Sequence, residues 1–98
     1  MKYVVQILKD AKALISDPRN WAQGYLSAGE SYCMLGAIIQ TQKSLPQPFQ
    51  YNESYHVACD VLESVCGQRV IKYNDAYGRM HSQIMAKFDE AIAKAEGK

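Results

Sequence analysis

The sequence predicts an all-α fold, a compact bundle of about four helices in one domain that spans residues 1–98. Three observations support this prediction. Apolar residues recur at steps of three and four along most of the chain, which is the period of one helix face. The intervals between these stretches are short and rich in Gly, Pro, Ser and Asn. An apolar fraction of 48% and a charged fraction of 21% are typical of a globular protein with one modest core.

The chain opens with an amphipathic stretch that predicts a helix over residues 3–15. Its apolar side chains recur at helical spacing, and polar side chains fill the opposite face. The helix should end near Ser16, because Pro18 disfavours helical dihedrals at the residue before it. Asp17 and Pro18 match the N-cap and first position of a short helical turn that carries Trp21. We expect Trp21 to fill the core where this loop crosses the bundle.

Residues 23–31 contain two glycines and two serines, a composition that predicts a loop. Apolar residues return at helical spacing over residues 32–42, so a second helix is predicted there, with Ser27 or Ser31 as its cap. Gly36 lies in the middle of this helix, where glycine costs roughly 1 kcal/mol relative to alanine. We therefore expect another helix to cross close to Gly36.

Two prolines within residues 43–50 predict a non-helical connection. A third helix is predicted over residues 52–66, with Asn52 as the candidate N-cap and Gly67 as the C-terminal terminator. Residues 69–73, with the sequence RVIKY, are short, β-branched and alternating. They predict a brief extended segment before the last helix, because one short strand has no evident partner.

The last stretch, residues 73–96, carries the longest uninterrupted helical pattern and is predicted to form the main wall of the core. It begins with a polar, turn-prone cluster and ends at Gly97. Its predicted apolar face follows helical spacing and consists of Tyr77, Met80, Ile84, Phe88, Ala91, Ile92 and Ala95.

Charge and composition exclude several classes of function. Eleven basic and ten acidic residues give a net charge of +1 without a basic excess on one element, so no nucleic-acid partner is expected. No apolar run approaches the ~18 residues of a membrane span. The N-terminal apolar run is short and lies between Lys2 and Lys9, unlike a signal peptide. We expect a cytoplasmic protein without membrane contact. No motif indicates a cofactor.

The three cysteines, Cys33, Cys59 and Cys66, are expected to be reduced and buried. They cannot all pair, and Cys59 and Cys66 lie two helical turns apart, beyond disulfide reach. Cys33 is also a candidate nucleophile, since a helix start lowers the pKa of a thiol. His56 and Cys59 are candidate metal ligands, with Cys66 or His81 completing the site. Their spacing is not diagnostic, so no metal is predicted.

The best candidate site is the polar cluster that contains Asn74, Asp75, Arg79 and His81, with Tyr77 among them. A carboxylate that orients an imidazole beside a guanidinium supports acid–base chemistry or binds a phosphate or carboxylate. The structural alternative is a turn in which Asn74 and Asp75 cap the last helix and Arg79 or His81 ties that turn to a neighbour. Asx residues form such local hydrogen bonds without a substrate, which favours the alternative. Arg79 and His81 are the members that this role leaves free.

Three short motifs carry a resemblance to a known family. They are a DP-W-G turn over residues 17–24, a YC-x-LGA helix start over residues 32–37 and an ND-x-x-GR-x-H cluster over residues 74–81. The chain resembles a small uncharacterised family that is found in actinobacterial and bacteriophage genomes and is described only as a domain of unknown function. The resemblance implies one domain and a phage or mobile-element origin, and it implies no reaction. The chain departs at Met80, where a Thr that completes a capping box with Gln83 is expected.

We predict a small non-catalytic helical module that binds a protein partner. Seven tyrosines in 98 residues favour an interaction surface, because not all of them can be buried in so small a domain. The implied phage origin makes a host or defence-system protein the expected target. The alternative is a small enzyme or anionic-ligand-binding protein that uses Asp75, Arg79 and His81. Self-association into a homodimer is compatible with either function.

Overall fold

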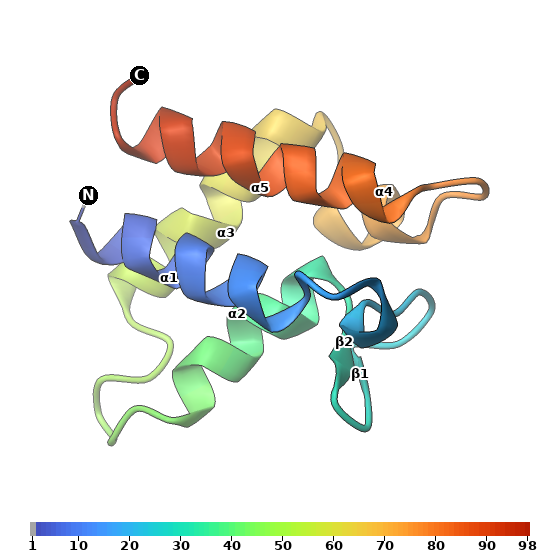
Figure 1. Ribbon diagram of the computed structural model, residues 1–98. Helices are drawn as coiled ribbons and strands as arrows, with labels where there is room; N and C mark the ends of the chain where they lie inside the picture. Colours follow the sequence, from blue (N-terminus) through green and yellow to red (C-terminus); the bar gives the residue numbers. More distant parts are fainter. Residues whose placement is uncertain (1) are drawn as a thin grey trace.

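The computed structural model describes residues 2–98 as a compact, mostly helical protein (Figure 1). In chain order its elements are α1 (Lys2–Leu14), the 3-10 turn η1 (Pro18–Asn20), β1 (Ser27–Ala28), β2 (Ser31–Tyr32), α2 (Met34–Lys43), α3 (Glu53–Cys66), α4 (Val70–Asp75) and α5 (His81–Ala95). Within residues 2–98, no helix has both the length and the apolar character needed to cross a bilayer.

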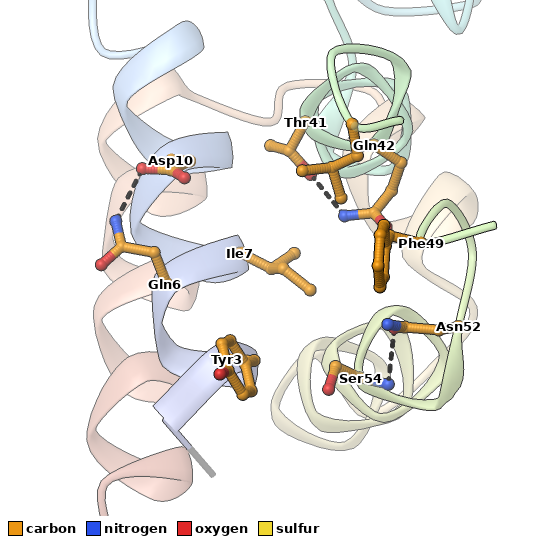
Figure 2. Close-up of a pocket in the computed structure, with 10 residues that line it drawn as sticks. Tyr3, Gln6, Ile7, Asp10, Thr41, Gln42, Phe49, Asn52 and Ser54 are labelled. Atoms are coloured by element: carbon orange, nitrogen blue, oxygen red, sulfur yellow. Dashed lines mark hydrogen bonds between the residues drawn. The ribbon is translucent and has the colours of Figure 1, made fainter. Parts of the chain in front are cut away.

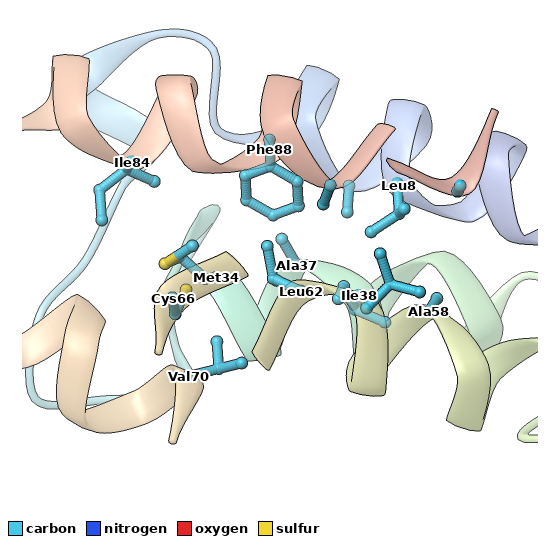
Figure 3. Close-up of a cluster of buried hydrophobic side chains, with 14 of the residues drawn as sticks. Leu8, Met34, Ala37, Ile38, Ala58, Leu62, Cys66, Val70, Ile84 and Phe88 are labelled. Carbon is cyan, nitrogen blue, oxygen red and sulfur yellow. The ribbon is translucent and has the colours of Figure 1, made fainter. Parts of the chain in front are cut away.

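The helices form two layers, with the core between them (Figure 3). One layer contains α1 and α5, which lie side by side and run in opposite directions, and the other contains α2, α3 and α4. The two ends of the drawn chain lie at one end of the molecule. The β1–β2 hairpin and the loop between α4 and α5 lie at the opposite end, which we call the loop end (Figure 1).

The core is built from side chains that both layers contribute. Leu8 and Phe88 point from α1 and α5 toward Met34, Ile38 and Leu62 of the other layer, and all five are fully buried (Figure 3). Each such side chain stabilises the fold by roughly 1.5–3 kcal/mol relative to an exposed position. The hydrophobic core therefore holds the two layers together.

Several local predictions are confirmed. The buried stripe of the first helix continues one residue beyond its end and consists of Val4, Leu8, Ala11 and Ile15. The buried stripe of α5 consists of Ile84, Phe88, Ala91 and Ala95. The Oδ1 atom of Asn52 accepts from the backbone of Ser54 at 3.1 Å and begins α3, and Gly67 ends it with a φ of 72°. These signals were readable because each depends on residues within one turn of the helix.

The all-α prediction holds at the level of a mostly helical fold, but its details need correction. Residues 2–98 form five α-helices and a small two-stranded sheet, not four helices. The segment 69–73, predicted as extended, is largely helix α4. Val70, Tyr73 and Asn74 follow helical spacing and are buried against the bundle. Burial on that face outweighs the weak strand preference of a β-branched pair.

The predicted loop over residues 23–31 contains most of the antiparallel hairpin, in which Ala28 pairs with Ser31 and Ser27 with Tyr32. The second helix begins at Met34, and neither Ser27 nor Ser31 caps it. The Sγ atom of Cys33 takes that role and accepts from the backbone N–H of Gly36 at 3.3 Å. Both serines belong to the hairpin instead.

The last helix begins later than the apolar pattern suggested. Tyr77 and Met80 precede α5 and are exposed, so neither belongs to its core-facing stripe. Half of a capping box survives, because the backbone N–H of Met80 donates to Oε1 of Gln83 at 2.8 Å. Methionine has no hydroxyl to return the bond. Asn74 and Asp75 end α4 and do not cap α5.

Candidate functional site

Asn74 lies at the centre of the loop end and is fully buried. Its Oδ1 atom accepts from the Nε1 atom of Trp21 at 2.7 Å and from the backbone N–H of Met34 at 3.0 Å. Its Nδ2 atom donates to the carbonyl of Ala22 at 2.9 Å and to Oδ1 of Asp75 at 2.9 Å. A carboxamide offers two donors and two lone pairs, so each has a partner. Asn74 therefore joins three segments that are far apart in the sequence.

Two further side chains complete this arrangement, which we call the Asn74 network. The Nε2 atom of Gln23 donates to the carbonyl of Asn74 at 2.9 Å and lies 3.3 Å from that of Ala76. The Oδ1 atom of Asp75 accepts from the backbone N–H of Gly24 at 2.9 Å. The network thus fixes the backbone of residues 22–24 against the end of α4.

The hairpin docks on α2 through backbone contact at Gly36. The backbone N–H of Cys33 donates to the carbonyl of Leu26 at 3.3 Å. A Cβ atom added at Gly36 would lie 1.8 Å from that same carbonyl oxygen, closer than atoms pack. The expected close crossing is therefore real, but the crossing element is the hairpin and not a helix.

His81 is held at the start of α5 by a contact with the residue that follows α1, the helix beside it in the same layer. Its Nε2 atom lies 2.7 Å from the carbonyl oxygen of Ile15. Because a carbonyl only accepts, Nε2 must carry the hydrogen. The ring centroid lies 6.0 Å from that of Trp21 with a tilt of 54°. His81 therefore links α5 to the end of α1 beside the Asn74 network.

Arg79 contacts Tyr73, a residue close to it in the chain. Its Nε atom donates to the carbonyl of Tyr73 at 2.8 Å, and its guanidinium carbon lies 3.6 Å from the centroid of the Tyr73 ring. A guanidinium stacked on an aromatic ring in this way gains cation–π attraction. Among residues 2–98, Tyr77 makes no comparable contact, and its side chain is fully exposed.

The structure therefore brings the predicted site residues to one end of the molecule but gives them separate partners. Asn74 and Asp75 bond each other and residues 22–24, Arg79 bonds Tyr73, and His81 bonds Ile15. Within residues 2–98, no hydrogen bond joins Asp75 to His81. The structural alternative correctly predicted hydrogen bonds to the backbone. It placed Asn74 and Asp75 at the start of the last helix, whereas they lie at the end of α4. Whether these residues bind a ligand stays a prediction.

The three thiols are free, and Cys33 and Cys66 are buried as expected, whereas Cys59 is only half-buried. Burial is the main cause that raises the pKa of each, to about 11 for Cys66. At Cys33 this opposes the lowering effect of the helix start, which argues against a nucleophile. No group of three His, Cys, Asp or Glu side chains in residues 2–98 is arranged to hold a metal ion, so His56 and Cys59 gain no further ligand.

Alkylation measures the state of the thiols. A rise in the pKa of Cys66 from 9.0 to about 11 lowers its thiolate fraction at pH 8 by about 100-fold, because only the thiolate reacts. We expect slow modification of Cys66 by iodoacetamide in the folded protein, at a rate that rises with pH up to about 11. The same protein in urea should react at the ordinary thiol rate. Rapid modification of the folded protein at pH 7, followed by peptide mass spectrometry, would contradict this assignment.

Several large apolar side chains lie exposed at the loop end. The sequence predicted these residues to lie in loops, a linker or the core. Tyr25 is 69% exposed, Leu26 47% and Ile71 43%, and the three line one small hollow beside Asp75. Tyr77 follows the carbonyl of Ala76 that Gln23 approaches, so it lies on the same end. We call Tyr25, Leu26, Ile71 and Tyr77 the loop-end surface. Only the high tyrosine content signalled it, because Leu and Ile are most often buried.

Fold and site together define a small two-layered helical protein in which a buried asparagine holds exposed loops in place. A model of the family DUF6197, described as a family of unknown function, matches residues 1–94, and the chain belongs to this family. The resemblance to an uncharacterised domain family is thereby confirmed. No curated protein and no solved structure matched the chain.

Proposed function

We propose that this protein is a non-catalytic binding module that contacts a partner protein through the loop-end surface. One observation carries the proposal: large apolar side chains are exposed on α4 and on two neighbouring loops, and a buried network fixes these segments to one another. Tyrosine is enriched at protein interfaces, where its ring fills pockets and its hydroxyl bonds at the edge. The polar residues predicted as a site then act as its support.

The Asn74 network favours binding because it orders the loops in advance. Residues 22–24 are held by Asn74 and Asp75, and Leu26 is held by Cys33. Loops that are already ordered lose less conformational entropy when a partner binds. A contact made by Tyr25 or Tyr77 therefore adds to affinity without a large ordering cost.

The charges that border the surface indicate the chemistry of the partner. Lys72 follows Ile71 in the chain and is exposed, whereas Arg69, also exposed, is paired with Glu63 at 3.4 Å. The carboxylate of Asp75, which also lies beside the surface, already accepts a hydrogen bond from the backbone N–H of Gly24. A partner with an apolar patch edged by carboxylates complements this arrangement. If the chain has the phage or mobile-element origin that the resemblance implies, a host or defence-system protein is the expected partner.

Comparative affinity capture tests the proposal. Immobilised wild-type protein and a Tyr25→Asp/Tyr77→Asp variant are exposed to the same native lysate, with Ala86→Asp at an exposed position of α5 as the control. We expect a protein that the wild type and the control retain and that the double variant loses. The purified partner should then bind the wild type in calorimetry at least tenfold more tightly than the double variant. Equal binding by all three proteins would refute a role for the loop-end surface.

A further inference from the structure

A groove with a volume of about 450 Å³ lies away from the loop end, between α1 and the connection from α2 to α3 (Figure 2). Ile7 points into it from α1 toward Phe49, with Tyr3 below, and Leu45 also lines it. Tyr3 is 70% exposed and Phe49 59%, so two aromatic rings are in contact with water. Sites for small molecules are mostly apolar and typically have volumes of about 300–1,000 Å³. The groove therefore has the size and lining of such a site.

Hydrogen bonds within the protein fix the wall of the groove that faces α1. Gln42 is buried, and its Oε1 atom accepts from the backbone N–H of Tyr51 at 3.1 Å. The Nε2 atom of Gln50 donates to the carbonyl of Leu45 at 2.7 Å. Tyr51 has a φ of 55°, a left-handed conformation that few residues other than glycine adopt. Phe49 therefore stands on a fixed backbone, and a ligand has little to order when it binds.

Asp10 is the one charged side chain among the described residues that line the groove. Its Oδ1 atom accepts from the Nε2 atom of Gln6 at 2.8 Å. Within residues 2–98 it forms no ion pair, because the neighbouring lysines of α1, Lys9 and Lys12, are paired with α5. A carboxylate can accept several hydrogen bonds at once. Asp10 therefore gives one end of an otherwise neutral groove a negative charge that is free to pair with a cation.

We propose that the groove binds a small organic amine, with its ammonium group at Asp10 and its apolar body extended along α1 toward Tyr3. Tyr3, Ile7 and Asp10 follow one another at steps of four and three, so they share one face of the helix. At a rise of about 1.5 Å per residue, Asp10 and Tyr3 are separated by roughly 10 Å along the axis. The ammonium group donates to the Asp10 carboxylate, and the apolar body contacts Ile7 and the Phe49 ring. An anion of the same shape is repelled.

Titration of the full chain with three probes of similar shape, followed in amide NMR spectra, tests this site. The probes are 4-phenylbutylamine, 4-phenylbutanol and 4-phenylbutyrate, which at pH 7 are a cation, a neutral molecule and an anion. The amine should shift the amide signals of residues 3–10 and 45–52. It should bind about twofold to fivefold more tightly than the alcohol, which is the gain expected from an exposed ion pair. The carboxylate should bind most weakly of the three.

Two variants separate the role of the charge from that of the apolar wall. Asp10→Asn keeps the shape of the side chain, so it should abolish the preference for the amine and leave the affinity for the alcohol unchanged. Asp60→Asn makes the same change at an exposed position of α3 outside the groove and should bind like the wild type. Phe49→Ala should weaken all three probes to a similar degree, because it removes apolar contact.

Three results would overturn the proposal. The first is that no probe shifts the signals of residues 3–10 and 45–52. The second is that the wild type binds the three probes equally, or that the preference for the amine persists in Asp10→Asn. The third is that these signals move with protein concentration and with none of the probes, which would show that a second copy covers the groove. None of these results bears on partner binding at the loop end.

Discussion

An Asn74→Ala variant is expected to lose roughly 3–5 kcal/mol of unfolding free energy, because each buried polar group left without a partner costs about 1–3 kcal/mol. The substitution removes the acceptor of the Trp21 Nε1–H and of the Met34 N–H, and the donor to the Ala22 carbonyl. Domains of this size are stable by only about 5–15 kcal/mol. The variant should therefore be partly unfolded at moderate temperature.

Urea unfolding followed by circular dichroism measures the effect. Asn52→Ala is the matched control, because it removes the same side chain from an exposed helix cap. Losing that cap should cost about 1 kcal/mol. Equal losses for the two variants would show that the Asn74 network does not contribute more than an ordinary cap. The proposed support of the loop-end surface would then lose its physical basis.

Gly36→Ala is expected to destabilise the protein by about 2–3 kcal/mol, as overpacking of a closely packed contact does. In an unobstructed helix the same change would stabilise by about 1 kcal/mol. Here the new Cβ atom meets backbone, at 1.8 Å from the Leu26 carbonyl oxygen and 2.7 Å from its carbon. A flexible side chain could move away, but the hairpin must shift as a unit and lose its bond to Cys33.

Thermal unfolding and amide NMR spectra check this expectation. The amide signals of residues 24–33 should move in the Gly36→Ala variant, and the melting temperature should fall. Gln40→Ala lies in the same helix and keeps the hairpin contact, so it should leave both nearly unchanged. A Gly36→Ala variant more stable than the wild type would mean that the hairpin does not pack on α2 as described.

Local signals in the sequence predicted four helices close to their observed positions, including the one expected over residues 32–42, which is α2 (Met34–Lys43). The stripes of α1, α3 and α5 are periodic over three or four turns, and Asn52 and Gly67 act on their own helix ends. Their physical causes lie within a few residues of each other. The period of the apolar residues and the helix caps therefore predicted the positions of these helices to within a few residues, apart from the start of α5.

Helix α4 and the role of Asn74 could not be predicted from such local signals. Six residues hold too few turns for a period to stand out, and Val70 and Ile71 favour strands when considered alone. Three of the four partners of the Asn74 side chain are 40 to 53 residues away in the sequence. A local reading assigns an Asx residue to the nearest turn, whereas here its side chain is used across the fold.

Trp21 is the only tryptophan in the chain, and its ring nitrogen donates to Asn74. Its fluorescence therefore reports on closure of the loop end, while far-ultraviolet dichroism reports mainly on the helices of the bundle. A kinetic experiment that follows both signals can separate the two events in time. Bonds that span about half of the chain close large loops, and loop closure of this kind is slow compared with helix formation. The fluorescence of this single indole therefore reports the rate of the step that orders the exposed surface.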